Sequence, residues 1–325
     1  MAKTLRVVFT FPARHLISVI PTVILLALLC GRFCDTSFLK VFIFPVAMLT
    51  IYPAMIGLQP RELLRFTDVP LTLFSLLLNF LVLPTLAVQI GTAFLGSQPE
   101  LYTGLLLISV VPGGNMAVAF TMLFKGNVKA SLKISTGNLI LGSLLAPLYL
   151  YYLAGTHIEI NVIRIAVSIG FVVLIPLCLG VITHSVILKR IGEKRFKGEI
   201  KPLLPAVSVW GLIYLVFTSV SMKAPMIFSY PELLIQALAS LLLWYCSILV
   251  ICTVVARLFL QRREAISLLL NVELRNLPIC IGIAVTAFPP QTAMMVSLAF
   301  LFQQQLAIWF LKTDGRYSLL EKRSS

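Results

Sequence analysis

Apolar segments long enough to cross a membrane recur along the whole chain. A hydrocarbon core about 30 Å thick needs about 20 apolar residues per helix, and short polar breaks separate segments of that kind here. They leave almost no sequence for a water-soluble domain. The chain is therefore predicted to be an all-α polytopic membrane protein with about ten transmembrane helices. The predicted spans are residues 15–31, 37–58, 69–95, 101–124, 128–153, 160–188, 202–222, 232–260, 264–288 and 291–311.

The composition agrees with this prediction. Of the 325 residues, 59% are hydrophobic and 12% are charged, whereas soluble domains carry about 25% charged residues. The net charge of +14 would suit a nucleic-acid-binding protein if the basic residues gathered on one soluble surface. They are instead spread over six separate loops and tails. We therefore expect the lipid bilayer, and no nucleic acid, as the surroundings of this chain.

The basic residues also predict the orientation, because Lys and Arg collect in cytoplasmic loops. With the N-terminus inside, four of the 26 Lys and Arg residues fall outside and two fall within spans, which leaves 20 in cytoplasmic segments. We expect a multi-pass protein of the cell membrane with both termini cytoplasmic. The first apolar segment is interpreted as a membrane helix, not a signal peptide, because Leu29 stands where cleavage needs a small residue. The six exceptions to the rule are Arg32, Lys40, Arg164, Lys223, Lys133 and Arg275.

Residue types in the spans argue against an enzyme and against a metal centre. The six cysteines show no C-x-x-C spacing, and the three histidines lie far apart in the sequence, so we expect no metal ligands. An intramembrane enzyme would need paired carboxylates or a nucleophile beside a base. Glu273 is the one acidic residue placed deep in a span. We therefore expect neither catalytic residues nor a cofactor.

Ten spans place five in each half, which gives the two halves opposite orientations. Residues 1–155 and 156–325 would then form two inverted five-helix repeats, a common plan among secondary transporters. In such proteins a Gly/Pro interruption at matching places in the two halves points to the binding site. The fourth span has VPGGN at 111–115, and the ninth span has NVELRNLP at 271–278.

Each interruption is predicted to open its helix near the middle of the membrane. Pro112 removes a hydrogen-bond donor, and Gly113 and Gly114 loosen the helix. The half-helix that begins near Asn115 would then offer free N–H groups and its positive dipole end to an anion. Asn276 would lie near the cap of the second half-helix. A pair of ordinary proline kinks is the alternative.

Charged residues accompany the second interruption. Glu273 and Arg275 lie beside it, and charges within a membrane are costly and usually functional. Lys133 falls within the fifth span. A structural ion pair is the alternative for Glu273 and Arg275, and snorkelling to the cytoplasmic edge is the alternative for Lys133.

These motifs resemble the bile acid:sodium symporter family, within the wider group that also holds arsenite-efflux permeases. The first interruption, the KGN turn at 125–127 and the hydroxyls of Ser131 and Ser135 resemble its Pro-Gly-Gly crossing helix and the helix that follows. The second interruption stands where the family usually reads Glu-x-Gly-x-Gln-Asn. The resemblance implies a core domain (spans 3–5 and 8–10), a panel domain (spans 1, 2, 6 and 7), and alternating access around two broken, crossing helices, spans 4 and 9.

The sequence departs from this pattern at the residues that hold sodium in the family. A guanidinium offers no oxygen ligand, so two intact sodium sites are not expected. We expect degenerate sites, with transport either sodium-independent or coupled to protons through Glu273, and ion coupling at Ser131, Lys133, Ser135, Asn271 and Glu273. The departures are Ala117 and Val118 in place of Ser-Asn, Asn271 in place of Glu, and Arg275 in place of Gln.

The resemblance also implies substrate contacts at Asn115 and Asn276. Side-chain amides can donate to a carboxylate or sulfonate, and a positive potential at the breaks favours a small organic anion. The glutamines of the tenth span could equally hold helices together. The predicted substrate-binding residues are Gly113, Gly114, Asn115, Arg275, Asn276, Gln304 and Gln305.

The expected function is secondary active transport of an organic anion by alternating access. An arsenite or other metalloid-oxyanion efflux permease is the alternative. Those permeases bind arsenite through a cysteine near the fourth-span break, which has none here, although Cys280 lies near the ninth-span break. An ion channel is a third class, but two dissimilar breaks fit an asymmetric solute site better than a symmetric pore. Oligomerisation is not required for any of these activities.

Overall fold

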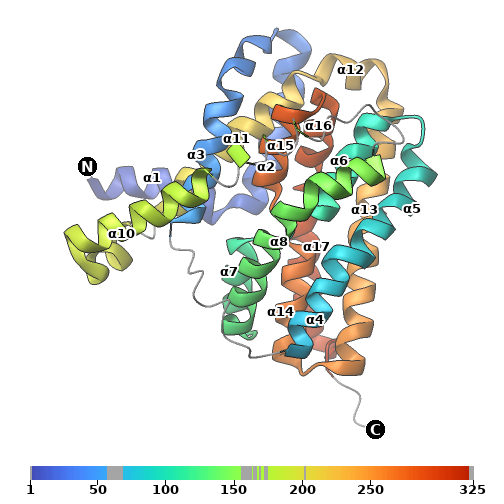
Figure 1. The fold of residues 1–325 in the computed structure, drawn as a ribbon. Helices are drawn as coiled ribbons and strands as arrows, with labels where there is room; N and C mark the ends of the chain where they lie inside the picture. Colours follow the sequence, from blue (N-terminus) through green and yellow to red (C-terminus); the bar gives the residue numbers. More distant parts are fainter. Residues whose placement is uncertain are drawn as a thin grey trace. The chain divides into compact units, whose positions relative to one another are not determined.

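The computed structural model describes residues 2–56, 69–154, 163, 167, 170–171, 175–200 and 203–321. Regular structure in these residues is helical, mostly α with short 3-10 and π segments (Figure 1). Across the same residues, a bridge between Gly113 and Arg275 is the one isolated backbone pairing of β type. The predicted all-α fold class is therefore confirmed for the described part of the chain.

Five of the described helices are long and apolar enough to cross a membrane. A sixth candidate consists of Val7–Arg14 and Ser18–Phe33, which meet at a bend of 92°. The shorter apolar helices include two pieces of the spans predicted to be interrupted, so a count by length falls below ten. The ten-helix inverted repeat, like the core and panel domains, stays a prediction. The five helices are Val69–Leu95, Val128–Leu153, Gly198–Ser221, Pro231–Phe259 and Pro290–Tyr317.

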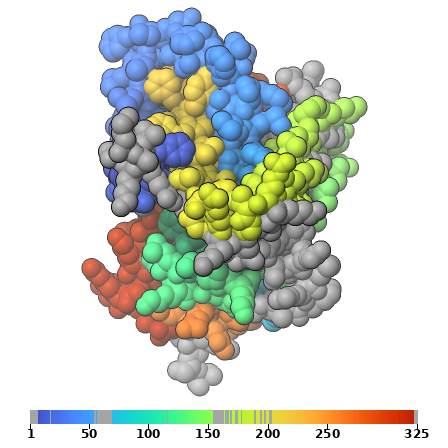
Figure 2. Space-filling view, turned by 90° about the vertical axis from the view of Figure 1, so that its left-hand side faces the viewer, coloured from blue at the N-terminus to red at the C-terminus, as the bar shows by residue number. Residues whose placement is uncertain are grey.

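The helices gather into two compact units, the first of which contains Met1–Leu58, Ile163–Pro231 and Pro278–Ser297. In this unit α11 packs against α2 and α3, and Figure 2 shows the gold of α11 beside the blue of the N-terminal helices. The Tyr214 hydroxyl donates to the Leu39 carbonyl at 2.7 Å. The helices are α1 (Ala2–Arg14), α2 (Leu16–Phe33), α3 (Ile43–Met55), α10 (Ile175–Arg195), α11 (Leu204–Ser221), α12 (Ala224–Ser229), and nearly all of α15 (Leu277–Ala287) and α16 (Pro290–Ala299).

The second unit contains Gln59–Val162, Glu232–Leu277 and Leu298–Ser325. Here α14 contacts α4, α7, α8 and α17 (Figure 1). The aromatic rings of Trp244 and Tyr245 on α13 are fully buried in its core. The elements are α4 (Val69–Leu77), the π-helix η3 (Leu78–Val82), α5 (Leu83–Leu95), α6 (Pro99–Val110), α7 (Asn115–Leu123), α8 (Val128–Ala154), α13 (Pro231–Phe259), α14 (Arg262–Glu273) and α17 (Gln303–Tyr317).

Several predicted spans correspond closely to helices. The third span, 69–95, is the continuous run of α4, η3 and α5, and the fifth span, 128–153, is α8. The tenth span, predicted as one helix, contains a turn at residues 300–302 between α16 and α17. Some residues used to predict the orientation lie outside the described part of the chain, namely Arg61, Arg65, Arg164, Lys201, Lys322 and Arg323.

Candidate functional site

The helices α6 and α14 of the second unit end where the sequence predicts an interruption. The first stops at Val110 and resumes as α7 at Asn115. The second stops at Glu273, and the next helix begins at Leu277. Proline has no N–H to continue a helical ladder, which accounts for the first stop just before Pro112. Both interruptions therefore leave short stretches of backbone outside helical hydrogen bonding.

The two interruptions lie in direct contact. Gly113 and Arg275 form an antiparallel backbone bridge. The backbone N–H of Asn276 donates to the carbonyl of Pro112 at 3.3 Å. Backbone groups that each broken helix leaves unpaired are thus partly satisfied by the other, as burial in a membrane protein requires.

The glycine pair makes this close approach possible. A Cβ atom on Gly113 would lie 2.6 Å from the carbonyl oxygen of Leu274, and a Cβ on Gly114 would lie 2.6 Å from Nδ2 of Asn276. Atoms do not approach so closely without displacement, so side chains are excluded by the facing chain. Gly113, Gly114 and Asn276 are therefore predicted site residues that the structure brings together.

The Arg275 side chain is buried, with 3% of its surface exposed, and it donates to backbone carbonyls of both interrupted helices. Its Nε donates to the Ile108 carbonyl at 2.9 Å and its Nη2 to the Ser109 carbonyl at 2.5 Å. Its Nη1 donates to the Val272 carbonyl at 3.4 Å and to Oδ1 of Asn79. Ile108, Ser109 and Val272 lie in the last turns of their helices, where carbonyls lack helical partners and the helix dipole is negative.

Further polar side chains hold this arrangement from neighbouring helices. Nδ2 of Asn79 donates to the Ser75 carbonyl at 2.9 Å, and Nδ2 of Asn138 donates to Oγ of Ser75 at 2.7 Å. Oε1 of Gln303 accepts the backbone N–H of Arg275 at 3.1 Å. Asn79 lies in the π-helix η3, a type of segment that often occurs at functional sites.

Ser75, Asn79 and Asn138 are not among the site residues predicted from the sequence. Asn79 stands in the run LLLNFLVLP, and a single amide among apolar residues at that depth is a signal of interhelical hydrogen bonding. The sequence alone does not show which residue Asn79 bonds. Both amides are buried, at 0% and 3% exposure for Asn79 and Asn138.

Residues predicted for ion coupling form a second polar cluster beside the first interruption. Nδ2 of Asn271 donates to Oγ of Ser131 at 2.7 Å, and the hydroxyls of Ser131 and Thr121 are 3.0 Å apart. The Ser135 hydroxyl donates to the Gly114 carbonyl at 2.9 Å. Oδ1 of Asn271 is buried and has no hydrogen-bond partner among the described residues.

Glu273 is fully buried at the end of α14. Within the described part of the chain, neither of its carboxyl oxygens has a hydrogen-bond partner. It lies within electrostatic range of the Cys246 and Cys252 thiols of α13 and of Arg275. The backbone N–H of Arg275 donates to the Glu273 carbonyl at 3.1 Å, whereas the side-chain hydrogen bonds of Arg275 described above go to neutral acceptors and not to the Glu273 carboxylate.

Two predicted residues take other positions. Lys133 is half-buried on α8, and helical spacing places it on the face opposite Ser131 and Ser135. The amide of Gln305, with its nitrogen oriented toward them, donates to the carbonyls of Leu301 at 3.0 Å and Phe300 at 3.2 Å. Gln305 therefore stabilises the turn before its own helix.

Gln304 contacts the first turn of α7, the helix that follows the fourth-span break. Its Nε2 donates to Sδ of Met116 at 3.2 Å, and Met116 is the second residue of α7. The backbone of Asn115 begins this helix, whereas its side chain lies outside the described part of the structure. Gln304 is thus placed beside the predicted anion-binding end of α7.

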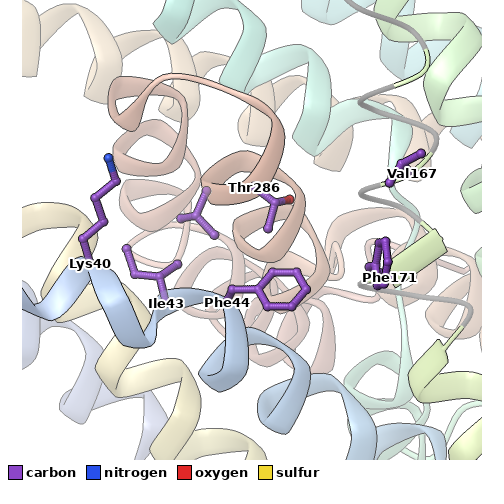
Figure 3. A pocket seen from close by; sticks show the side chains of 7 residues that line it. Lys40, Ile43, Phe44, Val167, Phe171 and Thr286 are labelled. Atoms are coloured by element: carbon purple, nitrogen blue, oxygen red, sulfur yellow. The ribbon is translucent and has the colours of Figure 1, made fainter.

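The first unit contains a separate cavity of about 380 Å³. Figure 3 shows Thr286 and Phe171 on two sides of the Phe44 ring, with Lys40 extending along one edge. The Thr286 hydroxyl donates to the Gly282 carbonyl of its own helix at 2.8 Å. None of the predicted site residues lines this cavity, whose walls are Lys40, Ile43, Phe44, Val167, Phe171, Val285 and Thr286.

The described residues hold no group of three or more His, Cys, Asp or Glu side chains placed to bind a metal ion. None of the six cysteines, all of which the structure describes, forms a disulfide.

Comparison with known proteins identifies relatives of this chain. It is similar to the uncharacterized protein YbaS of Bacillus subtilis, with 26% identity over 251 residues, covering 76% of this chain and 79% of that protein. It is also 35% identical over 109 residues to the probable chloroplastic sodium/metabolite cotransporter BASS2 of Oryza sativa subsp. japonica, covering 34% of this chain and 26% of that protein. Identity to the arsenical-resistance protein Acr3 of Corynebacterium glutamicum is 22% over 238 residues, covering 70% of this chain and 64% of that protein.

A family model gives the broader assignment. Residues 44–230 match the model of the Sodium Bile acid symporter family, which is more than half of the chain. The resemblance inferred from the two interrupted spans is thereby confirmed. The chain belongs to the Sodium Bile acid symporter family and is a multi-pass membrane transporter, not an enzyme.

Proposed function

We propose that this protein is a secondary active transporter that carries a small organic anion by alternating access at the contact of the two interrupted helices. The observation that carries the proposal is the buried Arg275 guanidinium where the breaks meet. A fixed positive charge in a low-dielectric site favours an anion over a cation or a neutral solute. The first N–H groups of α7 add a positive dipole end beside it.

The architecture proposed for this function has ten membrane helices. Residues 1–155 and 156–325 form inverted repeats, and a core domain moves against a panel domain. Support comes from the occurrence of one interrupted helix in each half, α6 with α7 and α14 with α15. The proposal includes cytoplasmic termini and a place in the cell membrane, as the distribution of Lys and Arg favours.

The predicted substrate contacts at the break keep their roles in this proposal. Gly113 and Gly114 allow close backbone approach, and the Asn276 amide lies beside Gly114. Gln304 approaches the start of α7 through Met116. These groups donate hydrogen bonds, which suits a carboxylate or sulfonate.

Uptake by purified protein in proteoliposomes tests the proposal. The probes are a short keto acid and a steroid-sized carboxylate, both radiolabelled. We expect saturable uptake of one of them by the wild-type protein and loss of that uptake in the Gly113→Val variant, which blocks the contact of the breaks. Absence of uptake of any organic anion, with arsenite carried instead, would contradict it.

Efflux of arsenite or another metalloid oxyanion is the second candidate. It is favoured by the similarity to Acr3, which extends over 70% of this chain. Cys280 is a buried thiol on α15, three positions after Leu277. Arsenite resistance of an arsenite-sensitive host that depends on this protein and is lost in Cys280→Ser would select this function.

A further inference from the structure

Resting on the proposed transport function, we propose that the Arg275 guanidinium is a built-in cation at the contact of the breaks, so that this carrier binds no coupling Na⁺ there. In transporters with interrupted helices, unwound carbonyls and the C-terminal ends of half-helices coordinate the coupling ion. The side chain of Arg275 donates to acceptors of that kind.

The acceptors come from the C-terminal ends of both interrupted helices. Ile108 and Ser109 belong to the last turn of α6, and Val272 belongs to the last turn of α14. Each helix end carries a partial negative charge, and the guanidinium lies between them. A single positive group therefore lies against two negative helix ends, as a bound metal cation would.

A side-chain oxygen, Oδ1 of Asn79, joins the backbone carbonyls around the guanidinium. These acceptors together are called the cation cage. Asn79 directs Oδ1 to Nη1 of Arg275, while its Nδ2 donates to the Ser75 carbonyl. Oγ of Ser75 accepts from Asn138 of α8 at 2.7 Å, which fixes its position. The amide of Asn79 is thus held with its oxygen toward the positive charge before any ligand arrives.

Sodium does not fit these residues. It needs several oxygens that face it, whereas these oxygens already face a positively charged group that has only donors and never loses its proton. At the neighbouring cluster, Asn271 supplies no negative charge, and its Nδ2, a donor, faces Oγ of Ser131. Its Oδ1, which has no hydrogen-bond partner among the described residues, is a neutral amide oxygen. Both places where sodium would be expected thus present a nitrogen donor to the oxygens.

A purely structural role for Arg275 makes a different prediction. If the side chain only held the breaks together, its replacement would weaken the fold equally in every salt. A cation cage, in contrast, accepts a metal ion once the guanidinium is removed and an oxygen is supplied. The Arg275→Gln variant does both, since its amide carbonyl adds an acceptor while the positive charge is lost.

The test measures thermal unfolding of purified protein in NaCl and in choline chloride at equal ionic strength, with no organic anion present. We expect the Tm of the wild type to be the same in both salts. We expect the Tm of Arg275→Gln to be higher in NaCl by about 2–4 °C, with a saturable dependence on Na⁺. Lys133→Gln, which removes another basic residue within a span, is the matched control and should gain no such response.

Three results would overturn the proposal. They are a saturable, Na⁺-specific rise in the Tm of the wild type, a folded Arg275→Gln protein without preference for Na⁺, and an equal gain in Lys133→Gln. The first result needs no variant. Direct binding of ²²Na⁺ to the wild type, which would overturn the proposal in the same way, can therefore be measured even if Arg275→Gln does not fold. Because no solute is involved, failure here leaves the proposed anion transport to be judged by its own uptake assay.

Discussion

The side-chain amide of Asn271 on α14 donates to the hydroxyl of Ser131 on α8 across 2.7 Å, and both side chains are buried. Since the residues are 140 positions apart in the sequence, this hydrogen bond joins the second interrupted helix to the helix that follows the first. It stands beside the contact of the breaks and contains no charge. Introducing a negative charge at Asn271 is therefore an informative experiment.

Asn271→Glu places a carboxylate among buried hydroxyls with no cation bound to it. We expect the variant to lose about 3–5 kcal/mol of unfolding free energy in choline chloride, because a buried charge without a partner is strongly destabilising. Part of that loss should be recovered in NaCl. Thermal unfolding in the two salts measures the effect, and Ser131→Ala, which adds no charge, is the control that should show no recovery. Equal losses in both salts would count against this expectation.

Gly113→Ala should separate the two breaks. The added Cβ would lie 2.6 Å from the backbone oxygen of Leu274, and a backbone atom cannot rotate away as a flexible side chain can. We expect a loss of about 1–3 kcal/mol in stability and a large reduction in the initial rate of anion uptake.

The matched control for this change is Gly315→Ala in α17, where an added Cβ meets nothing within 4 Å. Alanine there should be neutral or stabilising by about 0.5–1 kcal/mol, because glycine is unfavourable inside a helix. If both alanine variants had the same stability and uptake, the close approach of the Leu274 carbonyl would not explain why position 113 is a glycine.

Asn79→Ala removes the side-chain oxygen that accepts from Arg275. We expect a loss of about 1–3 kcal/mol in unfolding free energy, since a buried donor of a charged group is left without this acceptor. Thr85→Ala on α5 is the comparison, because its exposed hydroxyl donates to the Leu81 carbonyl one turn earlier, and its effect should stay within about 0.5 kcal/mol. Chemical denaturation of the two purified variants would show whether they differ.

The proposed orientation can be tested at Cys34, an exposed residue that follows α2. With both termini inside, this position faces the outside of the cell. A membrane-impermeant maleimide should therefore label intact cells, and Cys34→Ser should abolish that labelling. Modification that requires permeabilised cells would place both termini on the opposite side.

The interruptions could be predicted from the sequence because their causes are local. Proline without an N–H and two adjacent glycines weaken a helix wherever it packs, so Pro112 to Gly114 identify the first break directly. Helix limits followed from apolar length, and α8 begins at Val128 as predicted. These features depend on a few neighbouring residues.

The partners of Arg275 could not be predicted in this way. Asn79 is 196 positions away, and their contact depends on how whole helices pack. Among the three consecutive glutamines, Gln303 accepts the Arg275 N–H while Gln305 bonds back to its own turn. The unpredicted turn at 300–302 sets which side of α17 each of them occupies.

The cage around Arg275 has an electrical consequence. A guanidinium is covalently attached and permanently protonated, so it stays with the protein through every cycle, whereas a bound Na⁺ would cross with the solute. Unless a proton crosses through Glu273, a carrier built in this way moves its anion without an accompanying charge, which makes each turnover a current. A membrane potential of 100 mV contributes about 2.3 kcal/mol per elementary charge, and an interior that is negative drives such an anion outward.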